Sequence, residues 1–149
     1  MRDEDIDVYA DSPDHDGGIY TAVDAWLEDP AAAKARYGPI ASWDTSGITD
    51  MEYLFCSKKD FNEDISRWNV SNVVNMDYTL SYATSFTGDL SCWGFGQVKF
   101  MNQMFVGATS FTHQLGGAWS TSTANKFAMF ENSPGTIAGK VKTANGTIA

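Results

Sequence analysis

The chain has 149 residues and a net charge of −9, and its composition excludes two classes of protein. It holds 19 acidic against 10 basic residues, so it lacks the clustered Lys and Arg that phosphate binding requires, and we expect no nucleic-acid partner. No apolar run approaches the roughly 18 residues of a membrane span. Residues 1–5 do not read as a secretory signal, which fits either a cytosolic protein or a processed chain. The hydrophobic fraction of 43% is enough for one folded domain.

Residues 1–18 form the first segment, and their acidity predicts a solvated arm. Seven of them are acidic, with little apolar material to anchor them: Asp3, Glu4, Asp5, Asp7, Asp11, Asp14 and Asp16. Such a composition is typical of an extended or mobile chain. Residues 14–19 also resemble the middle of an EF-hand calcium loop. Because Ser12 and Val23 replace its first ligand and its closing glutamate, we expect no bound metal.

Residues 19–38 predict a helical cap at the N-terminal side of the domain. Ala22, Val23 and Trp26 recur at helical spacing. Pro30 interrupts this pattern, because proline removes a hydrogen-bond donor but suits the first turn of a new helix. The pattern therefore predicts two short helices, over 20–28 and 30–37, with Gly38 as the C-terminal cap.

Residues 39–133 repeat with a period of 25 residues. The period is seen in Phe61, Phe86 and Phe111, and in Trp43, Trp68 and Trp93, before Trp119 arrives one residue late. Alignment on tryptophan produces further apolar columns: Ile40, Ile65, Leu90 and Leu115; Ile48, Val73, Val98 and Ala124; Met51, Met76, Met101 and Phe127; Phe55, Leu80 and Phe105. A period in this range is typical of a stacked-repeat fold, and the columns predict inward-facing side chains.

Within one repeat the spacing predicts a strand and then a helix. Residues 61–68 suit a short strand that pairs with its copies in neighbouring repeats. Val73, Met76 and Leu80 then follow at helical spacing, with Ser71 as an expected N-cap. The predicted fold is an α/β repeat solenoid of about four 25-residue coils, with short parallel strands and short helices.

The same residues resemble a known family. Residues 61–66 and 68–76 look like the Mycoplasma-type surface lipoprotein repeat, which is grouped with BspA-like leucine-rich repeats and also found in proteins of unicellular algae. The resemblance covers residues 19–131 and implies a right-handed, leucine-rich-repeat-like solenoid used for adhesion or scaffolding, with no catalytic residues. Gly94 to Gly96 and the decayed fourth repeat depart from the family pattern.

The chain offers no arrangement that predicts catalysis. His15 and His113 lie in the acidic arm and the fourth repeat, and no Ser/His/Asp or metal-ligand spacing links them. Asp64 and Asp89 share one column, but outward positions in successive repeats explain them without paired acid–base chemistry. We therefore expect a protein that is not an enzyme and that carries no cofactor.

Two functional classes remain open. The first is a non-catalytic interaction module, either a peripheral scaffold subunit of a larger assembly or a surface adhesin, whose partner is another protein, possibly a basic one. The second is a carbohydrate or small-ligand binder that uses its tryptophans. Buried tryptophans favour the first class and exposed tryptophans favour the second.

The C-terminal third supplies the predicted partner-binding residues. The fourth repeat is incomplete, and the tail over 134–149 carries only isolated aliphatic residues. A stack that ends without a cap exposes apolar side chains, so the residues expected to contact a partner are Trp119, Phe127, Met129 and Phe130. The alternative is that the tail folds back, turning at Asn145 and Gly146, and covers this end itself.

Overall fold

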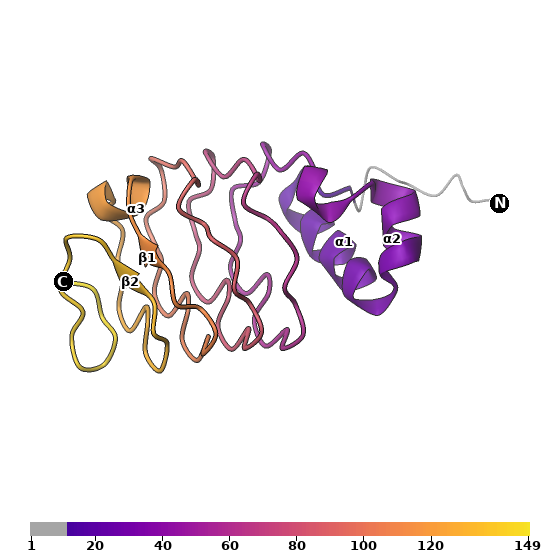
Figure 1. Ribbon diagram of the computed structural model, residues 1–149. Coiled ribbons are helices and arrows are strands. Elements are labelled where there is room, and N and C mark those ends of the chain that lie inside the picture. The colour runs from indigo at the N-terminus through magenta and orange to yellow at the C-terminus, as the bar shows by residue number, and fades with distance from the viewer. Residues whose placement is uncertain (1–11) are drawn as a thin grey trace.

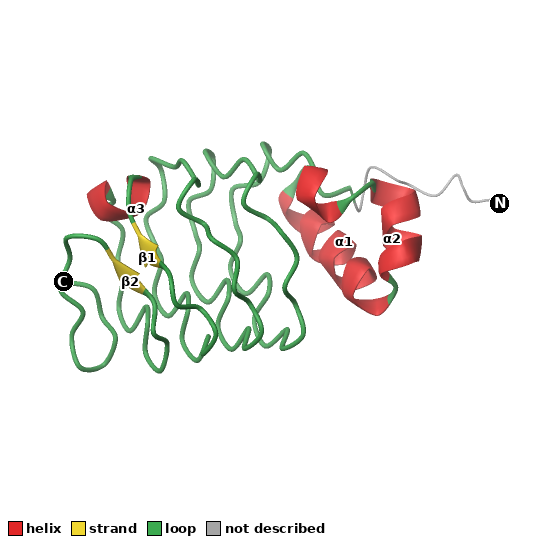
Figure 2. Ribbon diagram, in the orientation of Figure 1, coloured by secondary structure: helices red, strands yellow, loops and turns green. Residues whose placement is uncertain are grey.

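The computed structural model describes residues 12–149. Two helices lie at one end of an elongated body, and the C-terminus lies at the other end (Figure 1). The elements, in chain order, are α1 (Asp16–Glu28), α2 (Pro30–Tyr37), the 3-10 helix η1 (Ile40–Ser42), β1 (Gln114–Leu115), α3 (Ala118–Thr121) and β2 (Thr136–Ile137). Turns and irregular segments make up most of the remaining chain (Figure 2).

The predicted α/β repeat solenoid is wrong. Residues 43–113 contain neither the short parallel strands nor the short helices that this fold requires. The segment 61–68, expected as a strand, is irregular, and a series of turns replaces the helix expected after Ser71. Within residues 12–149 one small sheet is present, in which β1 and β2 pair in parallel through two residues each.

Residues in the left-handed backbone conformation explain why no helix forms. Tyr53, Ser57, Tyr78 and Tyr82 have φ angles of 62°, 61°, 59° and 58°. A right-handed helix requires negative φ at every residue, so each of these positions ends a turn before a helix can form. The spacing of Val73, Met76 and Leu80 is therefore produced by successive turns.

Backbone hydrogen bonds connect these turns to residues far along the sequence. The amides of Met51, Tyr53 and Phe55 donate to the carbonyls of residues 75, 77 and 79 at 2.9, 3.1 and 2.8 Å. Single parallel bridges also join Asp50 to Asn75, Asn75 to Phe100, and Phe100 to Asn125. Segments 25 residues apart therefore lie side by side in register, although they contain no regular strand.

The core is built from the predicted apolar columns, except that Phe127, expected to face inward with Met51, Met76 and Met101, is 57% exposed, because it lies 25 residues after the outer residue Asn102. Ile65, Val73, Met76 and Phe105 are buried, as expected. Stacked rings run through it, including Phe61 with Phe86 and Phe86 with Phe111, at 6.0 and 6.1 Å between centroids. Three buried indole groups each donate to a carbonyl of the preceding segment: Trp68 to Ile40, Trp93 to Ile65 and Trp119 to Leu90. These bonds position the largest side chains and satisfy carbonyls that water does not reach.

The N-terminal helices were correctly predicted, although α1 begins at Asp16 and therefore lies partly within the expected arm. Asp29 caps α2 by accepting a hydrogen bond from the amide of Ala32 at 3.1 Å. The carboxylate of Asp16 accepts bonds from the amide and hydroxyl of Thr49, both at 2.7 Å, so it anchors α1 to the first turn segment. The rest of the predicted acidic arm, residues 1–11, lies outside the described residues.

The C-terminal tail folds back, as the second of the two alternatives predicted. The amide of Phe130 donates to the carbonyl of Gly146 at 3.0 Å, and the amide of Ala128 donates to Thr147 Oγ1 at 2.7 Å. Gly146 has a φ of 82°, and a Cβ there would lie 2.2 Å from the amide nitrogen of Glu131. Glycine is therefore required where the tail covers the last turn segment.

Candidate functional site

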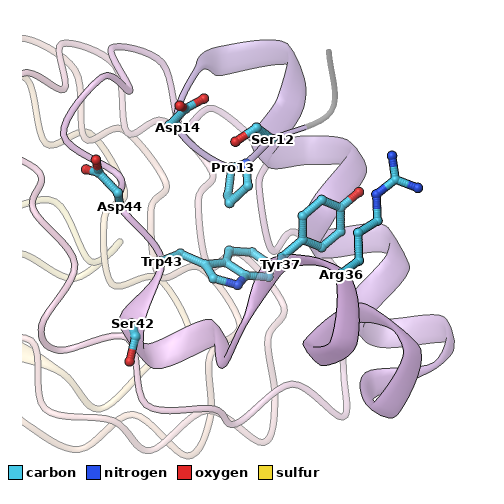
Figure 3. Close-up of a pocket in the computed structure, with 8 residues that line it drawn as sticks. All are labelled: Ser12, Pro13, Asp14, Arg36, Tyr37, Ser42, Trp43 and Asp44. Atoms are coloured by element: carbon cyan, nitrogen blue, oxygen red, sulfur yellow. The ribbon is translucent and has the colours of Figure 1, made fainter. Parts of the chain in front are cut away.

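A pocket opens where the N-terminal helices meet the first turn segment (Figure 3). Its volume is about 390 Å³, and it is lined by Ser12, Pro13, Asp14, Arg36, Tyr37, Ser42, Trp43 and Asp44. The Trp43 indole contacts the Tyr37 ring edge-on at 5.8 Å, and the guanidinium of Arg36 lies 5.3 Å from the centre of that ring. The lining thus combines aromatic rings with charges of both signs.

The polar groups of this pocket are engaged in local structure. Asp44 accepts hydrogen bonds from the amide and hydroxyl of Ser46 at 3.0 and 2.6 Å, and these bonds lower the pKa of its carboxyl. A hydrogen bond from His15 is the main cause that lowers the pKa of Asp14. A Cβ on Gly47 would lie 2.3 Å from the carbonyl oxygen of Asp14, which shows how closely the two segments pack. The pocket therefore arises from the way in which the helices pack on the first turns, and its polar groups serve that packing.

The predicted partner-binding residues do not share one environment. Trp119 and Met129 are 0% exposed and Phe130 is 1% exposed, because the tail covers this end of the molecule. Phe127 is 57% exposed. Of the four, Phe127 alone presents its side chain to solvent.

Exposed aromatic side chains gather on the turn segments. Within residues 12–149, five large apolar side chains are well exposed: Tyr53, Tyr82, Phe100, Phe127 and Val141. The first four lie in the segments 50–57, 75–82, 100–107 and 125–132, which the 25-residue register places side by side. A concentration of exposed aromatic surface on one part of a protein is typical of an interaction site.

Two adjacent rows of side chains on these segments, which include Tyr53 and Phe127 but not Tyr82 or Phe100, form a surface that we call the turn face. It consists of Glu52, Asp77, Asn102 and Phe127 in one row, and Tyr53, Tyr78 and Gln103 in the other. Hydrogen bonds connect the first row, since Asp77 Oδ1 accepts from the amide of Asn102 at 2.6 Å and Asn102 Oδ1 accepts from the amide of Phe127 at 2.9 Å. The face is therefore acidic and aromatic at its N-terminal end and apolar at Phe127.

A pair of tyrosines forms the N-terminal end of the second row. The rings of Tyr53 and Tyr78 stack with centroids 4.7 Å apart and an angle of 11° between them, and the Tyr78 hydroxyl donates to Gln103 Oε1. Both tyrosines have positive φ, which is uncommon for an aromatic residue. Gln103 and Ala128 take the same conformation in the next two segments, so packing does not require a ring at this position. The left-handed conformation is therefore a property of the turn, and the stacked rings are a feature of these two positions of the row alone.

The carboxylates beside the tyrosines influence one another. Burial raises the pKa of Glu52, and the charges of Asp50 and Asp77 raise it further. Burial is also the main cause that raises the pKa of Asp77, and Asp50 acts in the same direction. Desolvation raises the pKa of Tyr53, and the neighbouring Tyr78 and Glu52 raise it further. The result is a concentrated negative charge next to exposed rings.

The turn face was not predicted, although the sequence carried a signal for it. In the alignment on tryptophan, Tyr53, Tyr78 and Gln103 form one column and Glu52, Asp77 and Asn102 form the neighbouring one. Neither column predicts a site, because spacing alone does not distinguish a solvated residue from a binding residue.

The described residues contain neither a candidate metal centre nor a membrane-spanning helix. Within residues 12–149, no group of three His, Cys, Asp or Glu side chains is placed to hold a metal ion. In the same part of the chain, no helix combines the length and the apolar character needed to cross a membrane.

One comparison with known proteins identifies a family. Residues 29–140 match the family model described as "Mycoplasma protein of unknown function, DUF285". The search of curated proteins and the search of solved structures give no match. The match supports a Mycoplasma-type family and does not extend to the leucine-rich-repeat grouping that the sequence motifs resemble. Because it spans well over half of the chain, this protein belongs to the DUF285 family.

Proposed function

We propose that this protein is a non-catalytic protein-interaction module and that its turn face contacts the partner. The observation that carries this proposal is the concentration of exposed aromatic side chains on adjacent turn segments. Aromatic residues are enriched in the contact surfaces of protein complexes, because they bury a large area at a small cost in conformational entropy. A partner on this face would cover Tyr53 and Phe127, which are 51% and 57% exposed in the isolated chain.

The burial of the tryptophans supports this function over carbohydrate binding. Trp26 and Trp43 are 7% and 5% exposed, and Trp119 is 0% exposed. Trp68 and Trp93 are buried as well. A sugar ring stacks on an aromatic face that solvent reaches, and these indole faces are already covered by core side chains. A carbohydrate or small-ligand binder that uses its tryptophans is therefore the weaker alternative.

The proposal places the partner on the turn face rather than on the whole C-terminal third. Phe127 belongs to both surfaces, so it is retained as a contact residue. Met129 and Phe130 belong to the core, and the ring of Phe130 stacks on Phe105 at 5.2 Å. Their substitution would disturb folding before it disturbed binding.

The test uses substitutions that the chain already accommodates at equivalent positions. Tyr53→Gln copies Gln103, and Phe127→Asn copies Asn102. The tagged double variant should lose the proteins that the unmodified chain captures and cross-links in an extract of its source cells, while keeping its melting temperature. Val141→Ser, which removes a side chain that is 68% exposed on the tail, serves as the matched control. An unchanged set of cross-linked partners in the double variant would refute the proposal.

A further inference from the structure

The N-terminal end of the turn face carries negative charge that no basic side chain of the described chain neutralises. Glu52 and Asp77 lie on adjacent segments, which the bond of 3.1 Å from the amide of Tyr53 to the carbonyl of Asp77 joins, and burial followed by the charge of Asp50 raises the pKa of both carboxyls. Within residues 12–149, the salt bridges join other groups, His15 with Asp14 and Lys58 with Asp24. These three half-buried carboxylates therefore have no cationic partner within residues 12–149.

We propose that the tyrosine pair and the carboxylates of Glu52 and Asp77 bind an arginine side chain of an extended segment in the protein partner. This inference rests on the proposed function, because it specifies the chemistry of the partner at the same face. A guanidinium group fits the site better than an ammonium group. It is planar, so it stacks on a tyrosine ring, and its fork of N–H donors reaches two carboxylates at once.

The electrostatics of these carboxylates support cation binding. Glu52 and Asp77 are each partly desolvated and repel the charge of Asp50, so their ionised forms are disfavoured in the free protein. A bound cation offsets that repulsion, because an opposite charge within a few ångströms stabilises the ionised carboxylate. Binding of a cation therefore relieves the repulsion among these carboxylates.

The two rows also set the spacing of the partner segment. The turn segments are joined by parallel bridges, and bridged segments lie about 4.8 Å apart. Phe127 is two segments beyond Tyr78 and three beyond Tyr53, which places it roughly 10 to 14 Å from the tyrosine pair. An extended chain covers that span in about three to four residues. The segment therefore carries an arginine and, about four residues away, an apolar side chain that contacts Phe127.

The experiment uses the full chain and three labelled peptides with blocked ends. The first is Gly-Arg-Ser-Gly-Ser-Leu-Gly, the second replaces arginine by citrulline, and the third replaces it by lysine. Citrulline keeps the shape of arginine and removes its charge. Fluorescence anisotropy should show that the arginine peptide binds about tenfold more tightly than the citrulline peptide, with the lysine peptide between them. Added salt should weaken the arginine peptide most, because charge attraction at a surface is screened.

Two double variants with the same change in net charge locate the site. Glu52→Gln with Asp77→Asn should reduce binding of the arginine peptide to that of the citrulline peptide. Asp64→Asn with Asp89→Asn removes two carboxylates elsewhere and should leave binding unchanged. Each asparagine keeps the acceptor that its aspartate offered to a backbone amide, as Asn102 and Asn69 already do in this chain.

The outcomes separate this inference from the proposed function. Equal binding of the arginine and citrulline peptides would overturn cation recognition, and so would tight arginine binding by the Glu52→Gln, Asp77→Asn variant. Either result leaves the turn face intact as a contact surface, provided that Tyr53→Gln with Phe127→Asn still abolishes partner capture. If that capture is unaffected, the proposed function itself fails.

Discussion

The indole Nε1 of Trp93 donates a hydrogen bond of 2.9 Å to the carbonyl oxygen of Ile65, a residue 28 positions earlier in the chain. Both residues are buried, at 1% exposure each, so water cannot replace this bond. The contact joins two neighbouring segments that share no regular secondary structure. It shows that side-chain hydrogen bonds, together with the backbone bonds of the turns, maintain the register of the molecule.

Trp93→Phe should therefore destabilise the domain beyond the loss of ring volume. The substitution leaves the carbonyl of Ile65 buried without its donor, which costs about 1 to 3 kcal/mol in addition to the cavity. Urea unfolding followed by circular dichroism measures the change. Phe95→Leu, at a partly buried position that contacts Trp119 and donates no side-chain hydrogen bond, is the control and should cost less. Equal losses would show that the indole hydrogen bond contributes nothing.

Met76 and Asp77 are adjacent, and substitutions there should differ strongly in effect. Met76 is 0% exposed, so Met76→Asp buries an unpaired charge and should unfold the domain, at a cost of several kcal/mol. Asp77→Ala removes a side chain that accepts a hydrogen bond from the amide of Asn102, so it should cost less, about 1 kcal/mol. Asp77→Asn keeps an acceptor, so its melting temperature should remain closest to that of the unmodified protein.

The sequence predicted which side chains are buried but not the backbone that carries them. Val73, Met76 and Leu80 face the core, as their spacing required. Residues spaced three and four apart face the same side of the chain both in a helix and in a series of turns. The spacing therefore does not distinguish the two structures. The choice between them depends on bonds such as that from the Tyr78 amide to the carbonyl of Asn102, whose partners are 24 residues apart. A local pattern contains no information on such pairing.

The covered C-terminal end shows the same limit. Phe130 was expected to be exposed because the fourth repeat lacks a regular cap. It is buried instead, since its ring stacks on Phe105 and its amide donates to the carbonyl of Gly146 in the folded-back tail. Asn145 and Gly146 predicted a turn, but a turn alone does not state which surface it covers. By contrast, the helices α1 and α2 were predictable, because Pro30 and Gly38 mark their boundaries through local backbone chemistry.

Stability at low pH should depend on the aspartates that accept hydrogen bonds from serine. The side-chain bond from Ser66 is the main cause that lowers the pKa of Asp64, and Ser91 acts in the same way on Asp89. A carboxyl whose pKa is lower in the folded state stabilises the fold above its unfolded pKa of 3.8, and this contribution is lost as pH falls through the folded pKa.

Melting temperatures measured between neutral pH and the pKa of these aspartates test that dependence. Asp64→Asn with Asp89→Asn should show a shallower loss of stability with falling pH than the unmodified chain. Glu52→Gln should have the opposite effect. The pKa of Glu52 is raised on folding, so its ionised form costs stability at neutral pH and protonation relieves that cost as pH falls. Parallel curves for all three proteins would contradict this assignment of the proton-linked groups.

Gly146→Ala should open the C-terminal end, whereas Gly139→Ala should not. Both glycines have positive φ, at 82° and 76°, so each substitution carries a similar backbone strain of about 1 kcal/mol. The difference is spatial, because a Cβ at Gly146 would lie 2.2 Å from the amide nitrogen of Glu131, while a Cβ at Gly139 meets nothing within 4 Å. Release of the tail would uncover Met129 and Phe130 and promote association through the exposed core. Light scattering should therefore detect larger particles for Gly146→Ala, and limited proteolysis should remove its tail first. Identical behaviour of the two variants would show that closure of the tail does not depend on the close contact between Gly146 and Glu131.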